Sequence, residues 1–159
     1  MKIIIRKARL SDAHDVWQIN RDNWKYTFRN VYSKKRIEEK LARKPPEKDV
    51  EKMKEGVKKG YKYYVAISNG KVVGMLIYTT KKNVIDISCL YIDIKHHRLG
   101  IGSKLLTHVE NKTKAKTFTV TSASRKETID FYKKMGYRKL RTKKYKDTGD
   151  IDIVMMKRT

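Results

Sequence analysis

Two closely spaced glycines form the part of the sequence best suited to bind an anion. Gly100 and Gly102 follow an apolar run, residues 84–92, and precede a segment with the composition of a helix. A loop between a strand and a helix points unpaired backbone N–H groups and the positive end of a helix dipole at a ligand. A side chain at either glycine would hold a phosphate away from these donors. Arg98 and Lys104 add positive charge, so the spacing predicts a phosphate-binding loop.

The two glycines do not identify the ligand by themselves. The loop has neither the G-x-G-x-x-G pattern of a dinucleotide fold nor the G-x-x-x-x-G-K-[ST] pattern of a P-loop. A tight turn between strand and helix, with no ligand, is the alternative interpretation of the same residues.

A carboxylate lies inside the apolar run that precedes the loop. Strand alternation places Asp86 on the same face as Leu90 and Ile92. Cys89 and Tyr91 fall on the opposite face. Burial among apolar neighbours would raise the pKa of Asp86 toward that of a useful general base. The alternative is that the strand frays at its start and that Asp86 is hydrated.

The length and the cysteine content limit the class of protein. A chain of 159 residues suits one domain, residues 1–159, whose core needs neither disulfides nor a metal. Cys89 is the one cysteine, and no Cys/His spacing suggests zinc. No apolar run approaches the roughly 20 residues that cross a bilayer. The apolar stretch at the start of the chain is also too short for a signal peptide. We expect a soluble, cytoplasmic protein with no membrane segment.

The charge of the chain favours anionic partners. Forty Lys and Arg residues stand against seventeen Asp and Glu residues, which gives a formal net charge of +23. Phosphates, an acidic protein or a nucleic acid would be attracted, although a solvated coat of lysines is the alternative. The densest cluster, residues 138–146, alternates like a strand with one exposed cationic face. It lacks the aromatic platform of an RNA-binding sheet, so a nucleic-acid partner is not favoured.

The remaining elements follow from periodicity and turn residues. Asn69-Gly70 between two apolar runs predicts a hairpin, because both residues tolerate positive φ. Ser11 and Ser33 are candidate N-caps of two helices. The expected strands are residues 3–8, 63–68, 72–79, 84–92, 117–122, 138–145 and 151–156. The expected helices begin at Ser11, Ser33, Pro46, Ser103 and Lys126, and the third carries an apolar stripe of Val50, Met53 and Val57.

Two stretches carry a resemblance to a known family. Leu90-Tyr91-Ile92 followed by residues 97–102 resembles the acetyl-CoA motif [QR]-x-x-G-x-[GA] of the GCN5-related N-acetyltransferases (GNAT family), with His97 in place of Gln or Arg. Residues 128–137 resemble the A-x-x-[LF]-Y-x-x-x-G-[FY] helix of the same family. The resemblance implies an α/β (α+β) GNAT fold, a mixed and mostly antiparallel sheet of six to seven strands flanked by about four helices.

The resemblance also implies acetyl-CoA as the acetyl donor and a set of residues that bind it. In the family the strand before the loop pairs with the pantetheine arm, and a bulge there lets an N–H polarise the thioester carbonyl. Arg125 stands where many relatives have an asparagine that contacts the cofactor. The implied cofactor-binding residues are Leu90, Tyr91, Ile92, His97, Arg98, Leu99, Gly100, Ile101, Gly102, Ser103 and Arg125.

The catalytic and acceptor residues follow from the same resemblance. Tyr132 matches the tyrosine that acts as general acid on the leaving thiolate, and a buried packing role is its alternative. Asp86 falls where histone-acetylating relatives carry a glutamate base. Trp24, Tyr26 and Phe28 lie in the early region that covers the acceptor site in the family.

The expected reaction is acetyl transfer to a primary amine by direct attack in a ternary complex. An amine on a protein or peptide, a lysine or an N-terminus, is preferred, because a polyamine would approach a chain of charge +23 against repulsion. A polyamine or other small amine remains one alternative. A non-catalytic basic module that binds nucleic acid is the other.

Overall fold

The computed structural model describes residues 1–159 and contains one seven-stranded mixed sheet with five α-helices. The strand order is β1-β2-β3-β4-β5-β7-β6, and only β4 and β5 are parallel. This architecture confirms the predicted mixed and mostly antiparallel sheet, and its five α-helices match the five expected from periodicity, against about four implied by the resemblance. The strands are β1 (Ile4–Lys7), β2 (Lys62–Ser68), β3 (Lys71–Lys81), β4 (Val84–Ile92), β5 (Thr117–Ala123), β6 (Arg138–Lys144) and β7 (Ile151–Arg158). The helices are α1 (Ala13–Asp22), α2 (Lys34–Ala42), α3 (Asp49–Lys58), α4 (Ile101–Lys112) and α5 (Lys126–Lys134).

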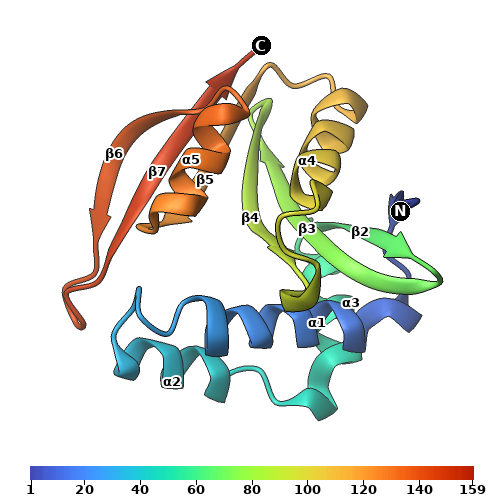
Figure 1. The fold of residues 1–159 in the computed structure, drawn as a ribbon, viewed down its shortest axis with the longest axis horizontal. Coiled ribbons are helices and arrows are strands. Elements are labelled where there is room, and N and C mark those ends of the chain that lie inside the picture. Colours follow the sequence, from blue (N-terminus) through green and yellow to red (C-terminus); the bar gives the residue numbers. More distant parts are fainter.

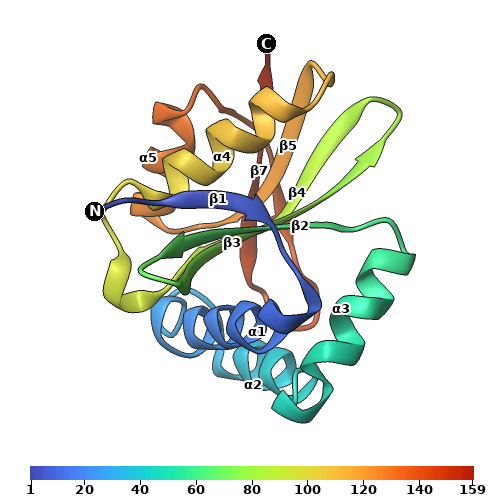
Figure 2. The ribbon, with the colours of Figure 1, turned by 90° about the vertical axis from the view of Figure 1, so that its right-hand side faces the viewer.

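Helices cover both faces of the sheet. Figures 1 and 2 show α1, α2 and α3 on one face and α4 and α5 on the other. The larger apolar core lies on the α4 and α5 side and includes Leu105, Phe118 and Met155. A smaller core packs α1 and α3 against β2 and β3 around Val16 and Met75. No helix is both long and apolar enough to cross a membrane.

The antiparallel strands β2, β3 and β4 form as predicted. Asn69 and Gly70 have φ of +49° and +75°, which is the geometry of a two-residue turn between antiparallel strands. Lys82 and Asn83, with φ of +50° and +64°, make an equivalent turn between β3 and β4. These turns fix the register that brings β4 to the centre of the sheet.

A bulge in β4 overturns the predicted assignment of faces. Ile87 pairs with Tyr78 and Cys89 pairs with Ile77, so Ser88 is an extra residue with no partner in β3. Alternation therefore reverses at Ser88. Leu90 and Ile92 pack against the same core as Ile85 and Ile87, whereas Asp86 lies on the opposite face from all four. The prediction that Asp86 shares a face with Leu90 and Ile92 is wrong.

The same bulge coincides with a split in the middle of the sheet. β4 and β5 pair only over Val84–Ile87 and Thr117–Val120. Beyond these pairs the two parallel strands separate, and the residues that follow on each strand face a cleft instead of each other. The separation leaves backbone N–H and C=O groups of both strands available to a ligand.

β6 forms the edge of the sheet, because β7 inserts between it and β5. All seven residues of β6 are exposed. The sequence predicted a strand with one exposed cationic face, and the edge position exposes the side chains on both faces.

Two local predictions, the N-cap of α1 and the apolar stripe of α3, also differ from the structure. A 3-10 turn, Leu10–Asp12, precedes α1, so Ser11 is not its N-cap. The Asp12 carboxylate accepts from the Arg9 backbone N–H at 2.7 Å instead. Val57 is exposed, so the predicted stripe on α3 is wrong at that position. Ser33 caps α2 as predicted, accepting from the Arg36 N–H at 3.2 Å.

Gly74 seats the start of α4 on the sheet. A Cβ at Gly74 would lie 2.9 Å from Ile92 Cδ1 and 3.1 Å from side-chain atoms of Ile101 and Leu105. Gly74→Ala is therefore expected to cost about 1–3 kcal/mol of stability. It is also expected to raise KM for acetyl-CoA severalfold, because Ile101 begins the helix that follows the glycine loop. Urea unfolding and initial rates measure the two effects.

Gly70→Ala is the matched control for this prediction. Its φ of +75° strains an alanine, but a Cβ there meets no atom within 4 Å. The control is expected to lower stability without altering KM for acetyl-CoA. Equal KM values for Gly74→Ala and the wild type would contradict the role given to Gly74.

Candidate active site

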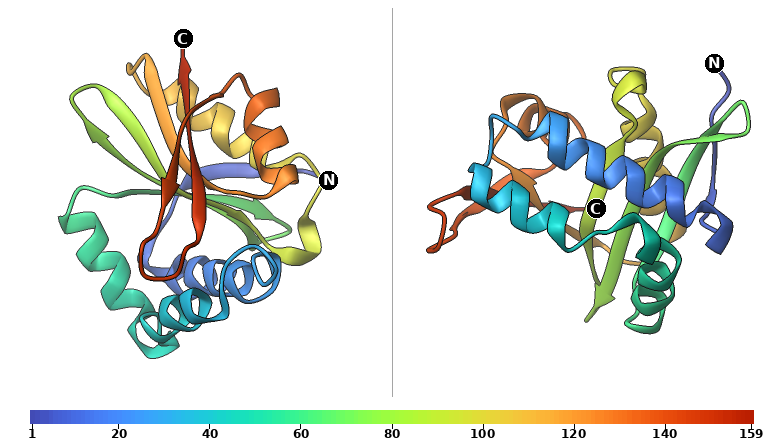
Figure 3. Two further views of the ribbon diagram at one scale, coloured as in Figure 1. Left: turned by 90° about the vertical axis from the view of Figure 1, so that its left-hand side faces the viewer. Right: turned by 90° about the horizontal axis from the view of Figure 1, so that it is seen from below.

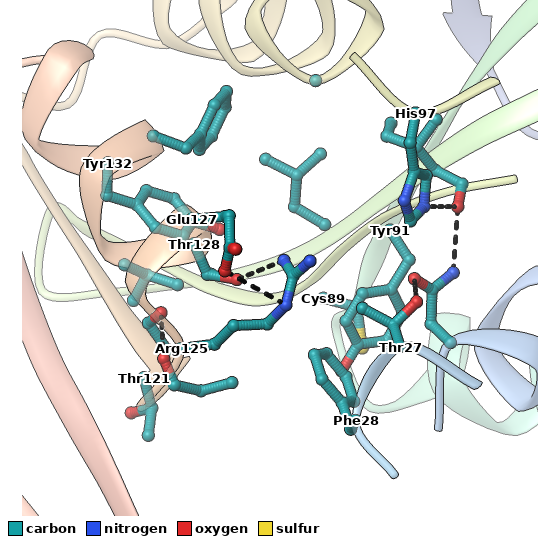
Figure 4. Close-up of a pocket in the computed structure, with 18 of the residues that line it drawn as sticks. Thr27, Phe28, Cys89, Tyr91, His97, Thr121, Arg125, Glu127, Thr128 and Tyr132 are labelled. Carbon is teal, nitrogen blue, oxygen red and sulfur yellow. Dashed lines mark hydrogen bonds and ion pairs between the residues drawn. The ribbon is translucent and has the colours of Figure 1, made fainter. Parts of the chain in front are cut away.

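A cleft of about 1370 Å³ opens where β4 and β5 separate. One wall is the end of β4 with the glycine loop and the start of α4, and the other is the end of β5 with α5. The loop region after α1, together with α2, closes one end. Figure 4 shows Tyr132 and His97 on opposite sides of the cleft, with Tyr91 on the same side as His97.

The glycine loop has the geometry of an anion site. Gly100 is the N-cap of α4 with φ of +76°, and no side chain caps this helix end. The N–H groups of the first helical turn therefore have no intrahelical partner, and Ile101, Gly102 and Ser103 all line the cleft. A Cβ at Gly102 would lie 3.4 Å from the Phe131 ring, so this glycine also lets α4 pack closely against α5. The cradle fits a diphosphate group.

Other predicted loop residues divide into those inside and those outside the cleft. Arg98, which has a positive φ of +63°, lines it, whereas Leu99 is 52% exposed and does not. His97 lines it too, and its Nε2 lies 2.9 Å from the Ile92 carbonyl oxygen. Asn23 donates to the same oxygen at 2.9 Å. His97 thus ties the loop to the end of β4, a structural task that the motif did not reveal.

Arg125, which the resemblance implied, and three lysines of α5, which it did not, also face the cleft. Arg125 extends into it from the start of α5, with Nε 3.5 Å from Glu127 Oε2 (Figure 4). Its Nη1 donates to the Thr128 hydroxyl at 3.4 Å. Lys126, Lys133 and Lys134 line the same wall. Their charges complement the several phosphate charges that a coenzyme A molecule carries.

Tyr132 occupies the α5 wall with its ring almost fully buried. Its side chain is 4% exposed, and its ring meets those of Phe131 and Tyr137 edge-on at 5.1 Å and 5.4 Å. Burial raises the pKa of Tyr132 well above its usual value, and the nearby Cys89 adds to the effect. The phenol is therefore protonated at neutral pH. A protonated hydroxyl beside the cleft is suited to donate a hydrogen bond or a proton.

The comparison with family models decides the family. The model of the acetyltransferase (GNAT) domain matches residues 28–159, which is most of the chain. This chain belongs to the GNAT family. As a GNAT acetyltransferase it is an enzyme that takes its acetyl group from acetyl-CoA, and the glycine cradle and the cationic α5 wall fit that donor.

Individual relatives agree with this membership. The chain is similar to a spermidine N(1)-acetyltransferase of Thermoplasma acidophilum, 24% identical over 99% of this chain and 98% of that protein. Among solved structures, the PaiA N-acetyltransferase of the same organism, in complex with coenzyme A, has a TM-score of 0.79, 21% identity and full coverage of both chains. A ribosomal-protein-alanine N-acetyltransferase of Brucella melitensis has a TM-score of 0.76, 18% identity, and coverage of 98% of this chain and 99% of that one. At these identities the structures show a shared fold.

The predicted base of this GNAT enzyme is not in the active-site cleft. Asp86 is exposed near the start of β4, and its carboxylate accepts from the Thr119 hydroxyl at 2.7 Å. It does not line the cleft, because the parallel pairing of β4 with β5 still continues at Asp86. The prediction of a buried carboxylate is wrong, and we assign Asp86 no role in the reaction.

Asp86→Asn is accordingly expected to leave the kinetics of the acetyltransferase unchanged. The substitution keeps an acceptor for Thr119 and alters only a solvated charge. The profile of kcat/KM against pH should overlay that of the wild type. Loss of the rise in rate toward alkaline pH would reinstate Asp86 as the base.

Aromatic side chains gather at the end of the cleft that the resemblance implies for the acceptor. Trp24 and Tyr32 stack with ring centroids 5.0 Å apart, and Phe28 meets Tyr91 edge-on at 5.6 Å. A π-helical turn, Asn23–Thr27, continues α1 and presents this cluster. Trp24 and Phe28, two of the predicted acceptor residues, line the cleft. Tyr26 is 47% exposed and lies outside it, since the turn directs its side chain to solvent, so it is not retained as an acceptor residue.

A buried carboxylate that the sequence analysis missed fixes the wall beside these aromatics. Asp152 of β7, 4% exposed, accepts from the Tyr32 hydroxyl at 2.5 Å and from the Tyr145 hydroxyl at 2.8 Å. The Arg36 guanidinium lies 3.6 Å from Asp152 and stacks 3.7 Å from the centre of the Tyr145 ring. This network joins α2 to the β6–β7 hairpin. Asp152 is a single acidic residue within the apolar run of residues 151–156, which by itself does not indicate such a network.

Two lysines beside Trp24 are held with weakened basicity. The ammonium groups of Lys40 and Lys44 lie 5.5 Å and 5.4 Å from the Trp24 ring centre. Burial lowers the pKa of Lys44 to about 8 and also lowers that of Lys40. Lys44 donates to the Asn20 side-chain oxygen, whereas Lys40 lines the cleft. An incoming ammonium would meet these charges, which favours its neutral, nucleophilic form.

The depressed pKa of Lys44 predicts a pH dependence of stability. Between about pH 8 and the ordinary lysine pKa of 10.5, the unfolded chain holds the Lys44 proton and the folded chain does not. The contribution of Lys44 to stability therefore rises with pH across this window. Urea unfolding at several values from pH 7.5 to 9.5 should show a more positive slope for the wild type than for Lys44→Met. Identical slopes would contradict the shift.

Proposed function

We propose that residues 1–159 work as one acetyltransferase domain that transfers the acetyl group of acetyl-CoA to a primary amine on an acidic polypeptide. The acceptor amine is an N-terminus or a lysine side chain. One observation carries this proposal. The acceptor end of the cleft offers Arg36, Lys40 and Lys143, and its one carboxylate, Asp152, is already engaged by three side chains.

The acetyl donor would be held by the parts of the cleft that carry donors and positive charge. The first turn of α4 and Arg98 would bind the diphosphate, and Lys126, Lys133 and Lys134 would contact further phosphate oxygens. The free backbone groups at the end of β4, from Ser88 to Tyr91, would pair with the amides of the pantetheine arm, whereas the Ile92 carbonyl is already engaged by Asn23 and His97. The irregular backbone at Ser88 would aim an N–H at the thioester carbonyl.

The reaction would proceed by direct attack in a ternary complex. The neutral amine nitrogen forms a bond to the thioester carbonyl carbon, and the carbon–sulfur bond then breaks. Tyr132 donates a proton to the departing thiolate, and the proton lost by the amine returns to solvent or to the phenolate. Because Lys40 and Lys44 oppose protonation of a nearby amine, the site needs no carboxylate base to produce the nucleophile.

A polyamine is the second candidate acceptor. The similarity to a spermidine N(1)-acetyltransferase supports it, since that relative matches along the whole chain. The charge of the acceptor end opposes it. A cationic amine would lie among positive side chains there and would find no free carboxylate to pair with.

A panel of acceptors tests the proposal. Release of coenzyme A thiol is measured with an acidic peptide carrying a free N-terminus, the same peptide with a blocked N-terminus and one lysine, a neutral peptide and spermidine. We expect kcat/KM for an acidic peptide to exceed that for spermidine at least tenfold, and the difference to shrink at high salt. A preference for spermidine would overturn the proposed acceptor class.

A thermal-shift measurement separates the enzyme from a nucleic-acid-binding module with the same fold. Coenzyme A is expected to raise Tm, because it binds the folded state only. Stabilisation by RNA or DNA with no response to coenzyme A would support the module instead.

A further inference from the structure

The edge strand β6 carries an unusual density of positive charge. Five of its seven residues are cationic: Arg138, Lys139, Arg141, Lys143 and Lys144. Every residue of β6 is exposed, and the strand ends beside Tyr145 in the wall of the cleft. Figure 1 shows β6 at one side of the molecule, and Figure 3 shows the β6–β7 hairpin extending past α1 and α2.

The outer edge of β6 has backbone groups with no partner strand. β6 pairs with β7 on one side only, since it is the last strand of the sheet. Leu140 is an extra residue between Lys139 and Arg141, so the ladder is irregular at that point and regular from Arg141 to Lys144. A regular, exposed edge is a template on which an extended chain can add a strand.

Three cations on one face of β6 form a row that leads toward the cleft. Arg138, Arg141 and Lys143 pair with Met156, Val154 and Asp152 of β7. Met156 and Val154 are buried, although neither belongs to an apolar core cluster. Lys143 lies opposite Asp152 and lines the cleft. The charged heads therefore form a row that ends at the acceptor site.

We propose that β6 is the docking strand for the acceptor, and that an extended acidic segment of the polypeptide substrate pairs with its free edge. The inference rests on the proposed function and specifies how the acceptor is recognised. Backbone hydrogen bonds to β6 supply affinity, and carboxylates along the segment meet Arg138, Arg141 and Lys143. At roughly 3.3 Å per residue, the acidic side chains would lie within about six residues of the acetylated amine.

Charge complementarity selects this occupant over two others. A second copy of the chain would bring its own five cations against those of β6, and like charges across paired strands are destabilising. A nucleic acid would match the charge but has no amide backbone to pair with the strand edge, and β6 carries no aromatic side chain for base stacking. An acidic peptide satisfies both the charge and the backbone.

The test uses a short fluorescent peptide of alternating glutamate and threonine, with a blocked N-terminus so that it binds without reacting. Fluorescence anisotropy measures its affinity for the wild type and for the double variant Arg138→Glu/Arg141→Glu. Lys58→Glu/Lys59→Glu, on the exposed end of α3, is the matched control with the same change in net charge. A second peptide of the same sequence is N-methylated at alternate amides. It keeps the charge of the first peptide but loses the backbone N–H donors along one edge of the extended chain.

We expect the β6 variant and the N-methylated peptide each to weaken binding about tenfold, and the α3 variant to change it far less. Equal binding of the N-methylated peptide would overturn strand pairing, and equal binding by the β6 variant would overturn the docking site. In competition, displacement of the labelled peptide by an oligonucleotide at a lower concentration than by an unlabelled acidic peptide would overturn the peptide as occupant. A dimer in sedimentation velocity that the β6 variant abolishes would overturn it too.

The free-amine form of the same peptide distinguishes this inference from the proposed function. Binding at β6 without acetylation would retain the docking strand and refute the acceptor class. Acetylation that is indifferent to the β6 variant and to N-methylation would retain the acceptor class and refute the docking strand.

Discussion

Replacing Tyr132 by phenylalanine is expected to lower kcat about a hundredfold with little change in KM for acetyl-CoA or in Tm. The substitution removes one hydroxyl from a ring that stays packed between Phe131 and Tyr137. The raised pKa keeps this hydroxyl protonated, so its loss removes a proton donor and no charge. Initial rates of coenzyme A thiol release give kcat and KM, and thermal denaturation gives Tm.

Tyr137→Phe is the matched control. Tyr137 packs against the same ring, but its hydroxyl donates to Glu110 at 2.8 Å, away from the cleft lining. The control is expected to lose about 1 kcal/mol of stability and to keep its turnover. An unchanged kcat for Tyr132→Phe would remove the acid role and leave Tyr132 as a packing residue.

Asp152→Ala is expected to produce the largest loss of stability, about 3–5 kcal/mol. Asp152 is the shared acceptor of the Tyr32 and Tyr145 hydroxyls and lies beside Arg36. Its removal leaves the largely buried Arg36 guanidinium, the buried Tyr32 hydroxyl and the half-buried Tyr145 hydroxyl without their acceptor. Because these contacts join α2 to the β6–β7 hairpin, the acetylation of peptides should also fall. Urea unfolding and peptide kinetics measure the two losses.

Asp150→Ala, in the same hairpin, shows whether the effect belongs to the network. Asp150 accepts from the Ser33 N–H and hydroxyl, each at 2.8 Å, in a more accessible position. Its loss is expected to cost about 1 kcal/mol. A cost for Asp152→Ala no greater than for Asp150→Ala would contradict the central place given to Asp152.

Local signals predicted the framework of the fold and the strand–glycine loop–helix geometry that follows β4. Asn69 and Gly70 require positive φ and occur between apolar runs, so the β2–β3 hairpin follows from a few neighbouring residues. The same holds for Gly100, whose left-handed conformation begins α4. In both places the chemistry of consecutive residues decides the backbone, with no need for distant contacts.

The bulge at Ser88 could not be predicted from the hydrophobic pattern. Leu90 and Ile92 on one face and Cys89 and Tyr91 on the other are all apolar, so either assignment of faces satisfies the sequence. Burial on both faces removes the alternation that normally fixes which side a residue faces. The misplacement of Asp86 follows directly from this ambiguity.

The network of Arg36, Tyr145 and Asp152 in the cleft wall could not be predicted, for a different reason. Arg36 lies more than one hundred residues from Tyr145 and Asp152 along the chain, and only the insertion of β7 beside β5 brings them together. Single charged residues on a surface helix and in a strand carry no local sign of such a partnership. The most specific part of this site is therefore the part that depends most on topology.

The short ladder between β4 and β5 has a mechanical consequence. Four residue pairs alone join the two halves of the sheet, from Val84 with Thr117 to Ile87 with Val120. We expect a joint this narrow to let the two halves of the sheet move relative to each other, and a molecule that lies along both free edges to restrict that movement. Substitutions that stiffen or loosen these four pairs should change how quickly the donor enters and leaves, although Val120 alone of their residues lines the cleft.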